Sequence, residues 1–159
     1  MRLKILLCAL LAFLALKLNG ETPCDLSLMR FVHGPKRLKV LSGCVTVRGV
    51  VAKRLPVNPW DGDYHVNIKL DPEFEHLLND FNRKNKKGAL VVEFVCQSRF
   101  ALKKEARKVC VGYSNRLQLP KVGDYIEITG IHVEDLKHGH NEIHPPSGVT
   151  VIKRKGARP

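Results

Sequence analysis

The sequence predicts a mainly β protein whose strands close into a small barrel. Three observations support this fold class: five segments have the alternation or β-branched composition of strands, glycine interrupts the longest two, and only short stretches have helical spacing. Glycine permits the bulges that curve a sheet, and closure of the sheet removes its exposed edges. A β-sandwich is the alternative architecture.

The five predicted strands are residues 44–55, 63–70, 89–96, 125–135 and 148–154. In "DYHVNIKL" every second residue is apolar, so one face of this strand is expected in the core: Tyr64, Val66, Ile68 and Leu70. "ALVVEFVC" is nearly continuous apolar sequence, which is typical of a central strand. We expect Gly49 to break the alternation of the first strand at a bulge, and Gly130 to bend the fourth.

Two short helices are predicted between the strands. Asp71 is a candidate N-cap with Pro72 at the first helical position, and helical spacing of apolar residues continues over residues 72–83. The second helix lies in "FALKKEARKVC" and ends near Cys110. Five strands with a helix between the third and the fourth indicate an OB-like Greek-key barrel, in which the helix at 72–83 is an insertion.

The first 20 residues have the pattern of a secretory signal peptide. Arg2 and Lys4 precede an apolar run from Ile5 to Leu16, which is short for a membrane span. Of the 27 basic and 15 acidic residues in the chain, removal of residues 1–20 takes away three basic ones and no acidic one, which leaves 24 against 15 and a formal charge of +9. The mature protein is therefore expected to be secreted or periplasmic and to have no transmembrane segment.

Four cysteines remain in the mature chain, and an even number in an exported protein predicts two disulfides. Three connectivities are possible. We favour Cys24 with Cys44, which would tie an N-terminal extension to the first strand, and Cys96 with Cys110, which would close an excursion of about 15 residues. The predicted organisation is a signal peptide (1–20), the extension (21–43), the barrel (44–152) and a basic tail (153–159).

"HGHNEIHPP", residues 138–146, places three histidines and a glutamate within seven positions. On an extended strand these side chains would share one face, as metal ligands could: His138, His140, Glu142 and His144. The spacing matches no zinc motif, however, and Gly139 favours a turn that would break the common face.

A structural role is the stronger interpretation of this segment. Backbone donors could satisfy the side chains of Asn141, Glu142 and His144, and Pro145 and Pro146 would end the strand pairing. No cofactor is therefore expected. The alternative is a metal-assisted hydrolase or nuclease-like enzyme, with the metal ligands Asp63, His65, Glu142 and His144.

In "WDGDYH", Asp61 and Gly62 most simply form a turn.

Several of these segments together resemble a family of small, functionally uncharacterised proteins with an OB-like barrel: "DGDYHVNIKLDP", "LVVEFVC" and "HGHNEIHPP". The family shares a D-G-D-x-H strand and a closing H-G-x-N-E-I-H-P motif, and the resemblance covers about residues 35–152. It implies the barrel and no particular activity. The family motif has an aromatic residue, typically Trp, where this chain has His140, so the resemblance implies that a shared function does not need His140 as a ligand.

Charge is the most informative indication of function. Basic side chains cluster after the first predicted helix and in the second excursion, and an exported chain with a charge of +9 favours anionic partners such as nucleic acid or acidic glycans. We therefore expect a non-catalytic binding module for an anionic polymer or acidic surface. The candidate ligand-binding residues are His65, Lys69, Arg83, Lys84, Lys103, Lys104, Arg107, His138, Glu142 and His144.

Overall fold

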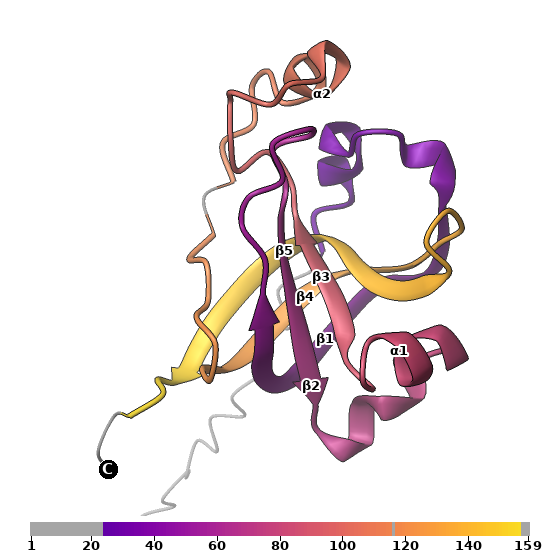
Figure 1. The fold of residues 1–159 in the computed structure, drawn as a ribbon, viewed down its shortest axis with the longest axis vertical. Helices are drawn as coiled ribbons and strands as arrows, with labels where there is room; N and C mark the ends of the chain where they lie inside the picture. Colours follow the sequence, from indigo (N-terminus) through magenta and orange to yellow (C-terminus); the bar gives the residue numbers. More distant parts are fainter. Residues whose placement is uncertain (1–23, 116, 157–159) are drawn as a thin grey trace, which may run out of the picture.

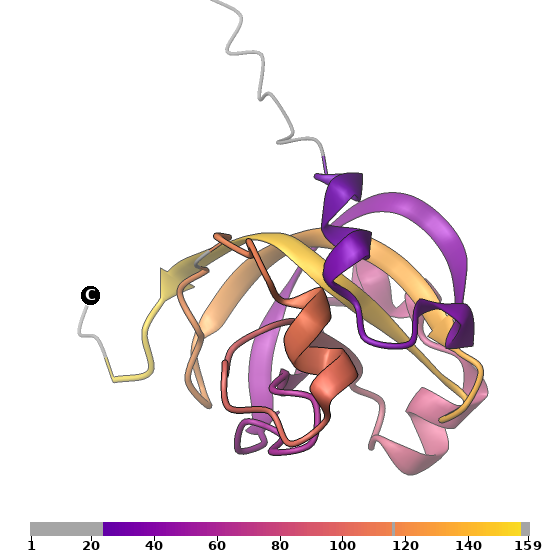
Figure 2. The same cartoon turned by 90° about the horizontal axis from the view of Figure 1, so that it is seen from above.

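A computed structural model of the protein describes residues 24–115 and 117–156, so the predicted signal peptide and the end of the basic tail lie outside the described residues. Five strands form a closed barrel in the order β1-β2-β3-β5-β4, in which only the β3–β5 pair is parallel (Figure 1 and Figure 2). This confirms the predicted mainly β, OB-like architecture. The strands are β1 (Leu38–Arg54), β2 (Tyr64–Leu70), β3 (Leu90–Phe94), β4 (Tyr125–Asp135) and β5 (His140–Lys153).

The helices of the described chain are short. They are the 3₁₀ helices η1 (Leu26–Phe31), η2 (Pro35–Arg37) and η3 (Pro72–Leu77), and the α-helices α1 (Asp80–Asn85) and α2 (Lys104–Val109). As predicted, α2 lies between β3 and β4 and ends near Cys110, which is its C-cap. Figure 1 shows α2 at one end of the barrel and α1 beside the opposite end of β3.

The predicted helix at 72–83 is divided into η3 and α1. Leu78 has an extended backbone, and Asn79 then begins α1 with a capping box. In this box the Asn79 side chain accepts a hydrogen bond from the backbone N–H of Asn82, and the Asn82 side chain accepts one from the N–H of Asn79. Phe81 is consequently turned outward, where it is 37 % exposed and lies beside His140.

The interior of the barrel is apolar. The predicted face of β2 points into it, together with alternate residues of β3 and with Ile143 of β5: Tyr64, Val66, Ile68, Leu70, Leu90, Val92 and Phe94. The opposite face of β3 is buried as well, and Arg37 of η2 pairs with Glu93 on it. Beyond the end of β3, Leu28, Phe31 and Val32 form a second, smaller apolar cluster with Val95.

Gly49 does not mark a bulge, contrary to the prediction. The alternation of β1 continues through it, with Val47 and Val51 both buried, and the pairing with β2 shifts only between Val51 and Lys53. Glycine is needed here because β2 approaches closely: a Cβ at residue 49 would lie 2.2 Å from the carbonyl oxygen of Lys69.

The prediction that the prolines end strand pairing is wrong, because β5 begins at His140 and continues through Pro145 and Pro146. Pro146 pairs with Gly130, and the register between β4 and β5 shifts on both sides of Gly130. An irregular ladder of this kind tolerates residues that have no N–H to donate. His140, Glu142 and His144 therefore do share one face of a strand.

Two disulfides join Cys24 to Cys44 and Cys96 to Cys110, which is the favoured connectivity. The first ties the N-terminal segment to β1, which begins at Leu38, upstream of the predicted start. Such disulfides are typical of proteins that fold in an oxidising, extracytoplasmic compartment. Within residues 24–115 and 117–156, no helix is long and apolar enough to cross a membrane.

Candidate functional site

The turn before β2 directs Asp63 into the protein. The carboxylate of Asp61 accepts hydrogen bonds from the Asn58 side chain at 2.9 Å and from the N–H of Asp63 at 3.2 Å. Gly62 has a φ of +84°, and a Cβ there would lie 2.5 Å from the carbonyl oxygen of Ser98. Asp63 is then buried, and its Oδ1 accepts the N–H of Cys96 at 2.7 Å.

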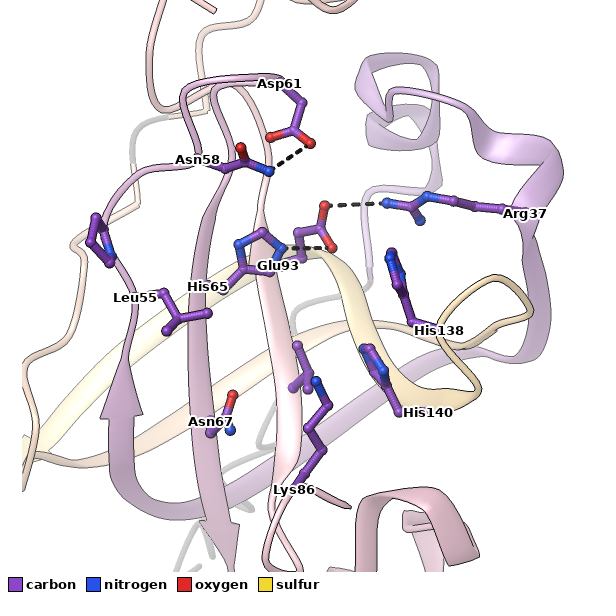
Figure 3. A pocket seen from close by; sticks show the side chains of 12 residues that line it. Arg37, Leu55, Asn58, Asp61, His65, Asn67, Lys86, Glu93, His138 and His140 are labelled. Atoms are coloured by element: carbon purple, nitrogen blue, oxygen red, sulfur yellow. Dashed lines mark hydrogen bonds and ion pairs between the residues drawn. The ribbon is translucent and has the colours of Figure 1, made fainter. Parts of the chain in front are cut away.

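Glu93 of β3 lies at the centre of a buried charged cluster (Figure 3). Its Oε1 lies 3.3 Å from Nη2 of Arg37, and its Oε2 lies 3.0 Å from Nε2 of His65 and 3.4 Å from Nδ1 of His144. Glu93 is only 4 % exposed, so these three partners replace the water that a carboxylate loses on burial.

Glu93 and its partner Arg37 are the members of the charged cluster that the sequence interpretation missed. Glu93 lies in the run "LVVEFVC", which was assigned only as a central strand. A carboxylate inside such a run is itself a signal, because charged side chains are almost never fully buried unless they are paired. Its partners come from three other parts of the chain, so only the tertiary structure identifies them.

Glu142 connects two histidines on the same face of β5. Its Oε2 lies 3.0 Å from Nε2 of His140, and its Oε1 lies 3.0 Å from Nδ1 of His144. All three side chains are buried. The expectation that backbone donors satisfy Glu142 and His144 is therefore wrong. Asn141 does bond to the backbone, but as a donor, to the carbonyl oxygen of Leu77 at 2.8 Å.

Burial and close pairing shift the pKa values in this cluster. Burial alone would lower the pKa of His144, but Glu93 and Glu142 outweigh it and raise the pKa to about 9. The pKa of His65 is raised in the same way, by Glu93 against burial. Burial and the charge of Glu93 raise the pKa of Asp63 to about 7. Burial also opposes ionisation of Glu93, yet His144 and His65 lower its pKa. Close pairing therefore favours the charged forms of His144 and Glu93, whereas burial favours the neutral form of Asp63.

A cleft of about 310 Å³ opens on the outer face of β2 and β3, over this cluster (Figure 3). The β1–β2 loop lines one side, and the rings of His138 and His140 line the other, stacked with their centroids 5.9 Å apart. The residues that line it are Arg37, Leu55, Pro56, Asn58, Asp61, His65, Asn67, Lys86, Val91, Glu93, His138 and His140.

A second hollow, of about 280 Å³, adjoins the cleft, because Asn67 and Lys86 line both. Among the described residues that line this hollow none is acidic, and four are lysines: Lys53, Lys69, Lys86 and Lys87. We call it the basic hollow. Its positive charge is therefore not neutralised by its own lining, whereas Arg37 in the cleft is already paired with Glu93 and Asp135.

The structure brings only some of the predicted ligand-binding residues together. His65 and His138 line the cleft, and Lys69 lines the basic hollow. Glu142 and His144 lie in the buried cluster below. Of the alternative metal ligands, Asp63 and His144 lie near each other, His65 is joined to them through Glu93, and Glu142 bonds to His144.

The other predicted residues do not line the cleft or the basic hollow. Arg83 donates to the carbonyl oxygens of Leu78 at 2.7 Å and Glu75 at 3.1 Å, and so supports η3. Lys84 forms an exposed ion pair with Asp80. The remaining three lie in the excursion that contains α2: Lys103, Lys104 and Arg107.

No family model, curated protein or solved structure matches the chain. The resemblance to a family of OB-like proteins therefore stays a prediction, and the proposed function rests on the chemistry of the site.

Proposed function

We propose that this protein is a secreted, non-catalytic module that binds an anionic polymer, either nucleic acid or acidic glycan, on the outer face of β2 and β3. The observation that carries the proposal is the cleft and its junction with the basic hollow. OB barrels bind oligonucleotides and oligosaccharides on the face of strands 2 and 3, between the loops that join strands 1 and 2 and strands 4 and 5. Here the same face and both loops line the cleft, the loops through residues 55–61 and His138.

The two hollows offer different contacts. Exposed lysine ammonium groups can bind phosphate or sulfate without much loss of hydration, and Lys53, Lys69 and Lys87 are all exposed. The exposed ring of His138, which is stacked on the buried ring of His140, presents a flat face on which an unpaired base can stack. A polymer lying across both hollows would place its charges on the lysines and a ring on His138.

The test compares two sets of lysines that carry equal charge. The hollow variant changes Lys53, Lys86 and Lys87 to Gln. The control variant changes Lys103, Lys104 and Lys108, in the excursion that contains α2, to Gln. The binding of labelled oligo-dT and of a heparin oligosaccharide is measured by fluorescence anisotropy over a range of salt concentrations.

We expect the hollow variant to bind at least tenfold more weakly. For oligo-dT, the slope of log K against log salt should become less negative by about 2, because three fewer phosphates are neutralised. The control variant should stay within about twofold of wild type. Equal losses in the two variants would show that net charge alone attracts the polymer, and would overturn the proposed site.

The alternative, a metal-assisted hydrolase, is supported by the convergence of Asp63, Glu93 and His144 beneath the cleft. A substrate held in the cleft would contact this group through Glu93, which lines the cleft and belongs to the buried cluster. Turnover of the bound polymer in the same binding experiments, seen as shortened product, would favour this alternative over a non-catalytic module.

A further inference from the structure

Three buried side chains from separate parts of the chain converge beneath the cleft. Asp63 precedes β2, Glu93 lies on β3 and His144 lies on β5, and they are 2 %, 4 % and 0 % exposed. One donor atom of each lies within 4.8 Å of a donor atom of the other two. Metal ions are bound by carboxylate oxygen and imidazole nitrogen at about 2.0–2.2 Å, so donors at this spacing can surround one ion after small movements.

Asp63 and Glu93 present two carboxylates to each other in a site that excludes water. Arg37 and His65 pair with Glu93, whereas among the described residues no ion pair is formed by Asp63. Glu93 and Asp61 repel the Asp63 carboxylate, and His144 attracts it when the ring is protonated. A divalent cation between the carboxylates would offset this repulsion.

The His144 ring is fixed by a carboxylate, as the rings of metal-binding histidines usually are. Its Nδ1 lies 3.0 Å from Oε1 of Glu142, which is itself fixed by His140. Its Nε2 is buried and has no hydrogen-bond partner among the described residues. Metal-binding histidines generally donate one ring N–H to a carboxylate, which leaves the lone pair of the other nitrogen for the metal. Glu142 is thus the positioning residue, Nε2 is the ring nitrogen without a partner in the described part of the chain, and an ion that binds the ring takes the place of a proton.

We propose that Asp63, Glu93 and His144 bind one divalent transition-metal ion, Zn²⁺ or Mn²⁺, beneath the cleft. Two carboxylate oxygens with one imidazole nitrogen suit these ions better than Ca²⁺ or Mg²⁺, which prefer oxygen ligands alone. Both oxygens of Glu93 already have partners, but a carboxylate offers about four lone-pair sites, so it can hold Arg37, His65 and an ion together. This inference does not depend on the binding of an anionic polymer.

The experiment titrates chelator-treated protein with ZnCl₂ and with MnCl₂ in a calorimeter, and measures thermal melts with and without metal. We expect saturable binding of one ion per chain, and a melting temperature that rises with metal concentration because the ion binds only the folded state. Asp63→Asn and His144→Gln should abolish the binding. Glu142→Gln should weaken it by about 10- to 100-fold through loss of the ring's orientation.

His138→Gln and Glu134→Gln are the matched controls, because His138 is an exposed histidine near the cleft and Glu134 is a carboxylate outside the cluster. Both should bind the ion within about twofold of wild type. If His138→Gln lost the ion while Asp63→Asn kept it, the ion would be bound by surface histidines and the proposal would be overturned. A wild-type protein without saturable binding of one ion would overturn it as well.

A cobalt experiment on wild type decides the matter if the ligand variants do not fold. Co²⁺ bound by a low-symmetry set of nitrogen and oxygen ligands absorbs visible light more strongly than hydrated Co²⁺. We expect this absorption to grow until one ion is bound per chain and to be removed by one equivalent of Zn²⁺. A spectrum that stays that of the hydrated ion would contradict the proposed site.

Discussion

β3 presents Leu90, Val92 and Phe94 to the barrel interior and Val91 and Glu93 to the outer face, and both sets are buried. On the inner face, burial is stabilised by the transfer of apolar surface out of water, which is non-directional and tolerates similar side chains. On the outer face, burial of Glu93 depends on matched charges, because Arg37, His65 and His144 are its partners. The two faces of one strand thus belong to two kinds of core. Residues of the inner core can be replaced one at a time, whereas the charged residues of the outer one depend on one another.

Glu142 and Ile143 are neighbours on β5 that face the two cores, so their substitution gives the sharpest contrast. Glu142→Ala should lower the free energy of unfolding by about 3–5 kcal/mol, because His140 and His144 lose a shared buried partner. Glu142→Gln should be milder, since it keeps one acceptor. Ile143→Val should cost only about 0.5–1.5 kcal/mol.

Urea unfolding of the chelator-treated proteins gives all three values, without any contribution from bound metal. A loss for Glu142→Ala no larger than that for Ile143→Val would mean that the charged cluster is not interdependent, and the distinction between the two cores would fail.

A smaller effect is expected at the polar link between α1 and β5, which is buried but uncharged. The Asn82 side chain donates to the carbonyl oxygens of Ala89 at 3.0 Å and Asn141 at 2.9 Å, and accepts the N–H of Asn141 at 2.8 Å. Asn82→Ala leaves these backbone groups unpaired and should cost about 1–3 kcal/mol in urea unfolding.

Asn85→Ala is the control within the same helix, because Asn85 is exposed, and it should change the free energy of unfolding by less than about 0.5 kcal/mol. Similar values for Asn82→Ala and Asn85→Ala would mean that α1 contributes little to the outer face.

The smallest expected effect is a difference in pH dependence. Burial opposes ionisation of Asp135, but the hydrogen bond from His138 and the charge of Arg37 lower its pKa below the ordinary value of 3.8. A carboxyl with a lowered pKa stabilises the fold above about pH 4, and this stabilisation is lost as the pH falls through that range. The stability difference between wild type and Asp135→Asn should therefore shrink between about pH 6 and pH 3.

The inner-face variant Ile128→Val serves as the comparison, since no charge changes. Its difference from wild type should be the same at both pH values, as measured by urea unfolding. A pH-dependent difference for Ile128→Val, or a constant one for Asp135→Asn, would contradict the assignment of acid sensitivity to the charged face.

Alternation was enough to predict the inner core and not the outer one. "DYHVNIKL" correctly places Tyr64 and Ile68 inside, because period two follows directly from strand geometry. The same pattern assigns His65 to the polar side, but gives no sign that its ring bonds to Glu93. The other partners of Glu93 are Arg37 and His144, which lie far from it in sequence. Alternation carries no information about such distant contacts.

Single glycines and prolines in the sequence also led to wrong predictions where the reason for the residue lies elsewhere in the structure. Gly49 was predicted as a bulge, whereas it is glycine because the backbone of Lys69 lies against it. Pro145 and Pro146 suggested the end of a strand, but Gly130 on β4 provides the irregular register that accepts them. The disulfides were easier, because four cysteines allow only three connectivities, and the favoured one pairs each cysteine with its neighbour along the chain.

The parallel pairing of β3 with β5 has a consequence for the newly synthesised chain. β5 is the last strand to be made, and it inserts between β3 and β4. Until residues 140–153 emerge, the growing protein is an open, curved sheet with two unpaired edges, and Glu93 lacks His144. Closure then depends on contacts between residues far apart in sequence, which form slowly. The nascent chain is therefore most exposed to aggregation just before its final strand is complete.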